Sequence, residues 1–330
     1  MSGSSKRRDR AVRRLSLFGA AIAVAGIATS VAMDTQASAS ASLSSTTAAV
    51  NKNRHILAPT VPMVVASATG PTETCTTPSV PMYHVDALGS LDRWSFAAPL
   101  TGKPGWTEHS IGSGWAGLDV ISGGDGVLYT IDSSGALHWY SDGAYAGGGS
   151  DWAPNGGAVI GTGWGGLRTV ISGGDGVFYS VDSAGNLRWY RDLSMNGTAD
   201  WASNSGTVIG TGWGSARLVA AGGNGVIFAV QPSGTLSWYR HLSPLGGAAT
   251  WANGGNGATI GSGWGGFTQL ASMGGGVLLA RGPTGTVSWY RDTDPLGGTH
   301  SWANGASGIS EGTGWSNTQL VTDISGCDAV

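Results

Sequence analysis

Residues 160–164 have the sequence Ile-Gly-Thr-Gly-Trp, and the Gly-x-Gly-Trp part of this stretch occurs four more times in the chain. Its five tryptophans are Trp115, Trp164, Trp213, Trp264 and Trp315. Successive members lie 49, 49, 51 and 51 residues apart, so a unit of roughly 50 residues repeats from residue 79 onward. A β-solenoid would have a much shorter period, and a helical solenoid would place apolar residues at a spacing of 3.6. The sequence has neither property.

The other ten tryptophans follow the same period. One set is mostly followed by Tyr and consists of Trp94, Trp139, Trp189, Trp238 and Trp289. The other is usually followed by Ala and consists of Trp106, Trp152, Trp201, Trp251 and Trp302. Three sets of five account for all 15 tryptophans, which indicates five copies of the unit.

Each unit holds about four short strands. In the clearest copy we expect them at 167–172, 177–182, 186–191 and 207–210. Val177, Tyr179 and Val181 alternate with other residues and so share one face of a strand. The turn between the second and third strands has Gly at its fourth position in every copy, with Asp first or Pro second, as type I turns prefer. Four strands in a period near 50 residues are typical of a β-propeller blade.

The two ends of the repeat region are complementary. Residues 82–86 and 91–95 match the second and third strands of a blade, and residues 317–324 match a first strand. We therefore predict an all-β, five-bladed propeller over residues 79–330, with four-stranded blades and the last blade closed by the N- and C-terminal segments. Cys75 precedes this region and Cys327 lies near its end, so a disulfide between them would replace the missing covalent turn.

Composition excludes several classes of protein. The chain has 58 Gly among 330 residues but no Gly-X-Y period, which excludes collagen. With 41% hydrophobic and 11% charged residues, it is not disordered over most of its length. Six of the 17 basic residues lie in the first 14 positions, so the remainder is mildly acidic and a poor partner for nucleic acid. Two cysteines outside any CxxC motif make no zinc site, no calcium loop is present, and we expect no metal and no cofactor.

Residues 1–41 resemble an export signal. A basic start that includes Arg13 and Arg14 precedes an apolar stretch over 15–33, and small residues over 37–41 fit a cleavage site. The twin arginine resembles a bacterial twin-arginine signal, and the general export route stays open. An uncleaved membrane anchor is the alternative to a cleaved signal. Residues 42–78, rich in Ser, Thr, Ala, Val and Pro, are expected to be a linker. We therefore expect a secreted protein with no membrane span after cleavage.

The order of motifs in each unit resembles the tachylectin-2 family. This order is Asp-Trp-Ala, then Ile-Gly-x-Gly-Trp, an apolar strand, a turn and an aromatic-bearing strand, and it covers residues 79–330. That family consists of five-bladed propeller lectins that bind N-acetylated hexosamines. The resemblance implies a sugar pocket between adjacent blades, formed by the Asp-Trp-Ala loop and the Gly-x-Gly-Trp connector. It implies these candidate sugar-binding residues: Trp115, Trp164, Trp213, Trp264, Trp315, Asp151, Trp152, Asp200, Trp201, Trp251 and Trp302.

Each candidate also has a structural interpretation. The connector tryptophans would suit a sugar face, but they would also suit a wedge between blades. The tryptophans followed by Tyr are expected to pack in the core, while the tyrosines after them (Tyr140, Tyr190, Tyr239 and Tyr290) point the other way toward a pocket or a surface. The Gly-Gly-Asp-Gly stretches at 123–126 and 173–176 offer an acidic ligand group, but Asp-Gly favours a tight hairpin turn.

The repeat favours binding over catalysis. The position of His138 is occupied by Arg188, Ser237 and Ser288 in later units, and no catalytic motif stands out from the repeat. We therefore expect no enzyme and no catalytic residues. The expected function is multivalent, reversible binding of glycans of the N-acetylglucosamine or N-acetylgalactosamine type, or of a cell-wall polysaccharide, at up to five sites. The alternative is an extracellular protein-interaction scaffold that binds no sugar. The oligomeric state is left open.

Overall fold

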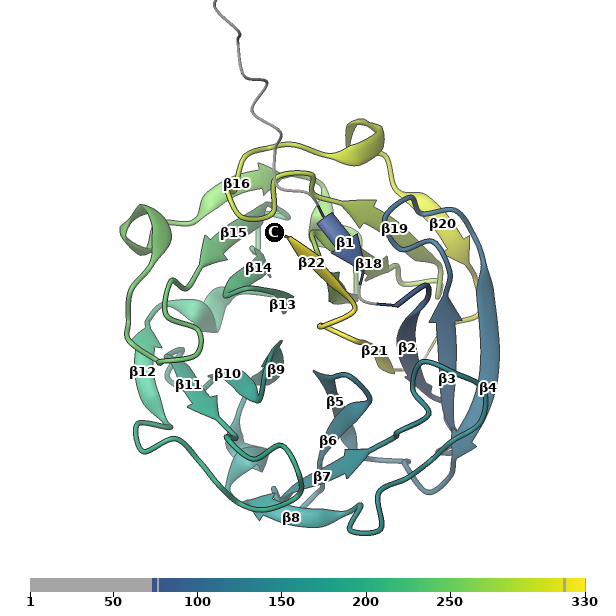
Figure 1. Ribbon diagram of the computed structural model, residues 1–330. Helices are drawn as coiled ribbons and strands as arrows, with labels where there is room; N and C mark the ends of the chain where they lie inside the picture. The colour runs from purple at the N-terminus through teal and green to yellow at the C-terminus, as the bar shows by residue number, and fades with distance from the viewer. Residues whose placement is uncertain (1–72, 76, 317–318, 330) are drawn as a thin grey trace, which may run out of the picture. The chain divides into compact units, whose positions relative to one another are not determined.

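The computed structural model describes residues 73–75, 77–316 and 319–329. The predicted export signal and most of the predicted linker lie outside these residues. The regular structure of the described chain consists almost entirely of short strands, which pair mostly antiparallel and are joined by turns and loops (Figure 1). They form five sheets arranged around a central axis, and we number the corresponding blades I to V in the order of their second strands along the chain.

The first strand of each blade lies at the central axis and the fourth lies at the rim. Blade I contains β21 (Gln319–Thr322), β2 (Val80–Val85), β3 (Leu91–Phe96) and β4 (Trp106–Gly112). Blade II contains β5 (Asp119–Gly124), β6 (Val127–Ile131), β7 (Leu137–Ser141) and β8 (Ala158–Gly161). Blade III contains β9 (Thr169–Gly174), β10 (Val177–Val181), β11 (Leu187–Arg191) and β12 (Thr207–Gly210).

The remaining two blades follow the same plan. Blade IV contains β13 (Leu218–Gly223), β14 (Val226–Val230), β15 (Leu236–Arg240) and β16 (Ala258–Gly261). Blade V contains β17 (Gln269–Gly274), β18 (Val277–Arg281), β19 (Val287–Arg291) and β20 (Ile309–Gly312), and β22 (Cys327–Ala329) and β1 (Glu73–Cys75) extend its inner edge. Five short 3-10 turns complete the described elements: η1 (Trp164–Gly166), η2 (Trp213–Ser215), η3 (Ala252–Gly255), η4 (Trp264–Gly266) and η5 (Ala303–Ala306).

The structure confirms the predicted all-β, five-bladed propeller of four-stranded blades. It also confirms that blade I combines both ends of the chain, because β21 near the C-terminus pairs with β2 near the N-terminus through Met82–Thr322 to Val85–Gln319. This arrangement leaves no open edge between the first and last blades of the ring.

The Gly-x-Gly-Trp connector owes its glycines to two different constraints. At the first glycine of one copy, Gly161, a Cβ atom would lie 2.7 Å from Nε1 of Trp164, so a larger residue would force the indole to shift. The second, Gly163, has a φ of 85°, a left-handed conformation that glycine adopts without strain. The motif is therefore a compact turn that folds the indole back over the end of the outer strand.

Cross-strand pairing changes the interpretation of one tryptophan. Trp139 pairs with Tyr129, and at the matching place in blade I it is Arg93, not Trp94, that pairs with Tyr83. Trp139 and its counterparts in the next three blades are buried, as predicted for core residues: Trp139, Trp189, Trp238 and Trp289. Trp94 lies one residue further on, at the position of Tyr140. The expectation of five core tryptophans is therefore wrong at one position: four are in the core, and the fifth position holds the buried Arg93.

Arg93 is buried because blade II supplies a partner for its charge. Its Nη1 donates to Oδ2 of Asp142 at 2.6 Å, and both side chains are fully buried. Its Nη2 donates to the carbonyl oxygens of Gly147 and Gly149. The charge and the two terminal nitrogens of the guanidinium are thus matched, which offsets the cost of burying it.

The predicted disulfide between Cys75 and Cys327 is present, but its place differs from the expectation. It joins the paired strands β1 and β22, and these lie on the inner edge of blade V instead of closing blade I. Strand β1 also falls within the segment that we expected to be linker. Both ends of the chain therefore leave blade I and are fixed together on its neighbour.

The segment between β21 and β22 crosses one end of the central axis. A Cβ on Gly124 of blade II would meet Oγ of Ser325, and one on Gly174 of blade III would lie 3.6 Å from Ile324. A Cβ on Gly274 of blade V would collide with the Cys327 carbonyl. The glycine-rich hairpins of the other blades thus leave room for the C-terminal segment.

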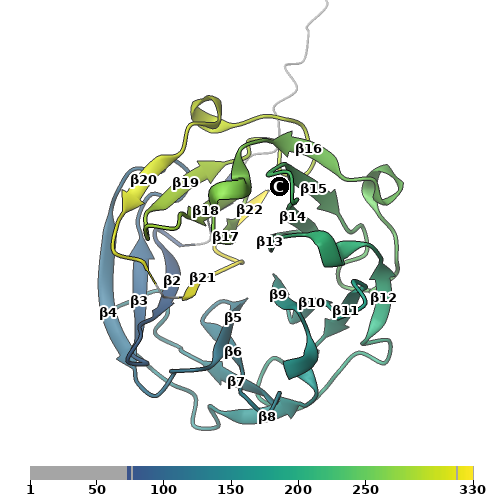
Figure 2. The same cartoon turned by 180° about the vertical axis from the view of Figure 1, so that it is seen from behind.

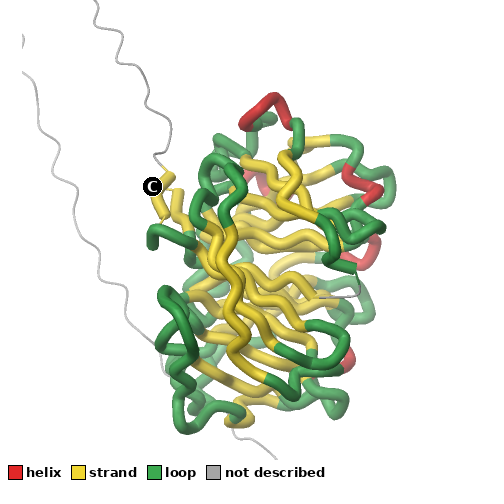
Figure 3. Tube along the Cα trace, turned by 90° about the vertical axis from the view of Figure 1, so that its right-hand side faces the viewer, coloured by secondary structure: helices red, strands yellow, loops and turns green. Residues whose placement is uncertain are grey.

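The two faces of the ring differ. Strand β22 and the C-terminal end lie on the face turned toward the viewer in Figure 1 and on the left in Figure 3. The view from behind brings the connector turns, such as η2 and η4, to the front (Figure 2). The Gly-x-Gly-Trp connectors therefore lie on the face opposite the disulfide.

Candidate functional site

An aromatic cluster fills each junction from blade I/II to blade IV/V. The connector tryptophan of one blade contacts the Tyr of the third strand and the Asp-Trp-Ala tryptophan of the next blade. At junction III/IV, Trp213 lies 4.7 Å from Tyr239 and 6.2 Å from Trp251 between ring centroids. The same three-ring clusters at the other three junctions are Trp115, Tyr140 and Trp152; Trp164, Tyr190 and Trp201; and Trp264, Tyr290 and Trp302. The structure thus brings the two predicted tryptophan sets together, pair by pair.

The Asp-Trp-Ala tryptophans also join neighbouring blades by hydrogen bonds. Nε1 of Trp152 donates to the carbonyl of Ile111 at 2.9 Å, and Ile111 lies in the outer strand of the preceding blade. Trp201, Trp251 and Trp302 make the same bond to the outer strands before them. These indoles thus hold the rim of the ring together, with part of each ring left accessible.

Junction V/I is built differently. Trp315 packs against Trp94 at 5.0 Å and His84 at 5.3 Å, in place of a tyrosine. Nε1 of Trp106 donates to Oε2 of Glu311 at 2.9 Å, so a side-chain carboxylate replaces the carbonyl acceptor used at the other junctions. Burial raises the pKa of Glu311, while the bond from Trp106 opposes that rise.

A cavity of about 330 Å³ opens at junction III/IV. Trp213, Tyr239 and Trp251 form its aromatic part, and the backbone of the Thr211–Gly212 connector forms one edge. Its remaining lining residues are Ile209, Gly210, Ala216, Gln231, Gly254 and Gly255. Aromatic faces beside exposed peptide groups and one amide side chain suit the apolar face and the hydroxyl groups of a sugar ring.

The connector tryptophans differ in exposure. Trp115, Trp164, Trp264 and Trp315 are 5–9% exposed, which agrees with the wedge interpretation. Trp213 is only half-buried and lines the cavity. Sugar binding by any of the five stays a prediction.

Asp151 and Asp200 lie apart from this kind of cavity. Both are exposed, each in the loop between the third and fourth strands of its own blade. The carbonyl oxygen of Asp151 accepts a hydrogen bond from the backbone N–H of Gly143. Thr250, at the same position before Trp251, is not among the residues that line the III/IV cavity. Asp151 and Asp200 therefore adjoin Trp152 and Trp201 in the chain, and the III/IV cavity is lined without a carboxylate.

Sequence reasoning missed Gln231 and Ala216. Gln231 occupies the first position of the turn that has Asp132 in blade II and Asp182 in blade III. The signal that could have found Gln231 was the loss of Asp from a turn that begins with Asp in blades I to III, a loss shared by Gly282 in blade V. For Ala216, the signal was a small apolar residue where three other copies have Leu or Phe and the fifth has Thr.

The aspartates of the other turns are fully engaged. Asp182 accepts bonds from Asn186 and Arg188, and these lower its pKa to about 2. Bonds from Ser134 and His138 hold the pKa of Asp132 well below its usual range, and Asp132 in turn raises the pKa of His138.

The Gly-Gly-Asp-Gly stretches are hairpin turns, as their sequence favours. Asp125 and Asp175 have φ values of 51° and 52°, and the glycines after them also have positive φ. Two successive positive φ values are the requirement of a type I′ turn. The structure therefore accounts for these aspartates by turn geometry.

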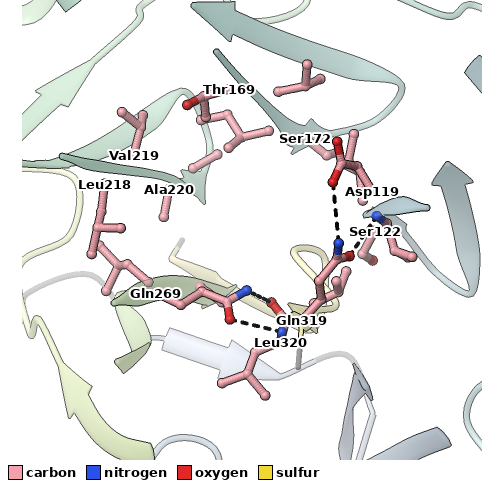
Figure 4. Close-up of a pocket in the computed structure, with 18 of the residues that line it drawn as sticks. Asp119, Ser122, Thr169, Ser172, Leu218, Val219, Ala220, Gln269, Gln319 and Leu320 are labelled. Carbon is pink, nitrogen blue, oxygen red and sulfur yellow. Dashed lines mark hydrogen bonds between the residues drawn. The ribbon is translucent and has the colours of Figure 1, made fainter. Parts of the chain in front are cut away.

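A second cavity of about 410 Å³ lies on the central axis (Figure 4). All five innermost strands contribute to its wall. Nε2 of Gln319 donates to the Leu118 carbonyl at 3.0 Å, and its Oε1 accepts from the Val120 backbone N–H at 2.9 Å, so this side chain binds the neighbouring blade. Gln269 makes the same pair of bonds to Leu320. The glutamines thus join inner strands that have no ladder between them.

Within residues 73–75, 77–316 and 319–329, no group of three or more His, Cys, Asp or Glu side chains is arranged to hold a metal ion. No helix in the same part of the chain is long and apolar enough to cross a membrane.

Comparison with known proteins gives one family. A family model described as Tachylectin matches residues 84–320. No curated protein sequence matches the chain. Among solved structures, the chain is similar to Aleuria aurantia lectin, a fungal lectin described as a six-bladed propeller with a fucose recognition mode, at 14% identity and a TM-score of 0.37 over 74% of this chain and 75% of that one.

Two further structures show comparable similarity. AofleA from Arthrobotrys oligospora is 10% identical with a TM-score of 0.39, covering 74% of this chain and 72% of that one. PorZ of Porphyromonas gingivalis is 14% identical with a TM-score of 0.33, and the match covers 76% of this chain but only 30% of PorZ. With TM-scores of 0.33, 0.39 and 0.37, these likenesses carry no argument about this chain.

Proposed function

The chain belongs to the tachylectin family, and from that premise we propose that it is a secreted carbohydrate-binding protein. Its ligands would be N-acetylated hexosamines, free or as units of a cell-wall polysaccharide, held reversibly between neighbouring blades. The observation that supports this best is the III/IV cavity, where half-buried aromatic faces and exposed connector peptides line about 330 Å³. Secretion rests on the export signal expected over residues 1–41.

The chemistry of such a site is non-covalent. The faces of Trp213 and Trp251 would pack on the C–H face of a sugar ring, and the Gln231 amide and connector peptides would bond its hydroxyl or acetamido groups. Binding of this kind orients the ligand and breaks no bond, which agrees with the non-enzymatic role expected for the family.

A glycan array tests the proposal. The folded full-length protein should bind structures that contain N-acetylglucosamine or N-acetylgalactosamine, and the free sugar should compete. Trp213→Ala should weaken glycan binding while lowering the melting temperature only slightly, since Trp213 is not fully buried. A folded protein that binds no glycan on the array would overturn the proposal and favour the protein-interaction scaffold.

A further inference from the structure

The junctions are not equivalent in the residue that follows each connector tryptophan by three positions. At junction III/IV this residue is Ala216, which lines the cavity. At the other junctions where this position is described, it is a larger apolar side chain: Leu118, Leu167 and Phe267. A longer side chain at position 216 would occupy part of the cavity.

Phe267 shows how such a side chain closes a junction. Its ring lies 5.5 Å from Trp264 and 5.9 Å from Tyr290, the two aromatics that correspond to Trp213 and Tyr239. Trp264 is correspondingly 5% exposed, whereas Trp213 is half-buried. The accessible indole face at junction III/IV therefore follows from the small side chain of Ala216.

The polar edge of the junction differs as well. In blade III, Arg188 bridges the Asp182 carboxylate and the Gly206 carbonyl, so the turn is tied to the loop beside it. In blade IV the same two positions hold Ser237 and Gln231, joined by a long bond of 3.4 Å. The Gln231 amide is therefore weakly held and lies on the cavity wall, where a ligand can bond to it.

The charge of the lining restricts the ligand. None of the residues that line this cavity carries a charged side chain. An anionic sugar would lose hydration there without gaining a cationic partner, and a cationic one would find no carboxylate. A neutral ring with an acetamido group matches aromatic faces, an amide and peptide groups.

We propose that junction III/IV is the dominant ligand site of this protein and takes one neutral N-acetylhexosamine unit, while the junctions that contain Leu118, Leu167 and Phe267 are closed. At junction V/I, Trp315 packs against Trp94 and His84 and is 9% exposed, so this junction offers no accessible indole face either. The inference rests on the proposed lectin function and replaces five equal sites by one. Binding to a polysaccharide would then be monovalent for each chain, without the avidity that five sites would give.

Titration of the ¹⁵N-labelled protein with N-acetylglucosamine tests the inference through its tryptophan indole signals. In the wild type, the signals of Trp213 and Trp251 should shift together and those of the other junctions should stay in place. Ala216→Phe should weaken binding at least tenfold, and Phe267→Leu, the matched control at junction IV/V, should leave it unchanged. Phe267→Ala should make the Trp264 and Trp302 signals respond as a new site opens.

The outcomes separate the two proposals. Indole signals of several junctions that shift with one midpoint, or an Ala216→Phe variant that binds as the wild type does, would overturn the single-site inference and leave the lectin function intact. An unresponsive Phe267→Ala variant would contradict the closing role of Phe267. A folded wild type that responds to no N-acetylhexosamine would remove the lectin function and the inference with it.

Discussion

Removal of the Cys75–Cys327 disulfide should weaken the ring without unfolding it. The bond closes a loop with a sequence separation of 252 residues, which includes all five blades. On the loop-closure relation, a loop of this size lowers the entropy of the unfolded chain by an amount worth roughly 5.5 kcal/mol at 25 °C. For a domain of this size, each kcal/mol changes the melting temperature by about 2–4 °C, so we expect a decrease of about 10–20 °C.

The fold should survive because other contacts hold the terminal strands. Strands β1 and β22 pair from Glu73–Ala329 to Cys75–Cys327, and Glu73 forms an ion pair with Arg291 of blade V. Blade I is also closed by its own β2–β21 ladder, which does not depend on the bond. The disulfide therefore stabilises a ring that is already complete without it.

The assay compares thermal and urea unfolding of the wild type with the double variant Cys75→Ala/Cys327→Ala, which leaves no free thiol. Wild type treated with a reductant is the control and should melt at the temperature of the double variant. Equal melting of the oxidised wild type and the double variant would refute the loop-closure reasoning. A double variant that does not fold would refute the claim that the ring is complete without the bond.

Three further predictions concern the Arg93–Asp142 ion pair, the Asp292 carboxyl group and the Gly161 turn. Arg93→Met leaves Asp142 buried without its cation and should lower the free energy of unfolding by about 3–5 kcal/mol, measured by urea denaturation; a loss below ~1 kcal/mol would contradict the pairing. Burial raises the pKa of Asp292 from 3.8 to about 7, so the folded state binds more protons and stability should fall as pH rises from about 4 to 7. Asp292→Asn should reduce that pH dependence and stabilise the protein at pH 8 in urea denaturation, and an unchanged profile would refute the assignment. Gly161→Ala places a Cβ against the Trp164 indole and should lower the melting temperature by at least several degrees, whereas an unchanged value would show that the connector can adjust.

Blade number and strand positions could be predicted because they depend on local rules that recur. The connector needs Gly161 for space and Gly163 for its backbone conformation, and both are visible as letters in the sequence. The alternation of Val177, Tyr179 and Val181 likewise places a strand. Each rule acts within a few residues, and because the unit repeats five times, the number of blades could be counted.

Other features depend on residues far apart in the chain. The place of Arg93 is decided by Asp142, 49 residues later and in another blade, so a tryptophan count assigned its position to Trp94. Strands β1 and β22 have three residues each, too few for an alternation pattern, and only the folded ring brings them together.

The candidate site was predicted in its common parts and not in its differences. The repeat indicated that the two tryptophan sets would meet between blades, and they do at four junctions. Which junction is open depends on single departures from the repeat, such as Ala216. Residues shared by all the blades do not reveal such departures.

A crystal structure of the protein with N-acetylglucosamine would locate the bound sugar without reference to any variant. We expect the sugar ring between blades III and IV, against the faces of Trp213 and Trp251 and within hydrogen-bond distance of Gln231. A sugar bound at another blade junction, in the cavity on the central axis, or on a surface away from the junctions would contradict this expectation.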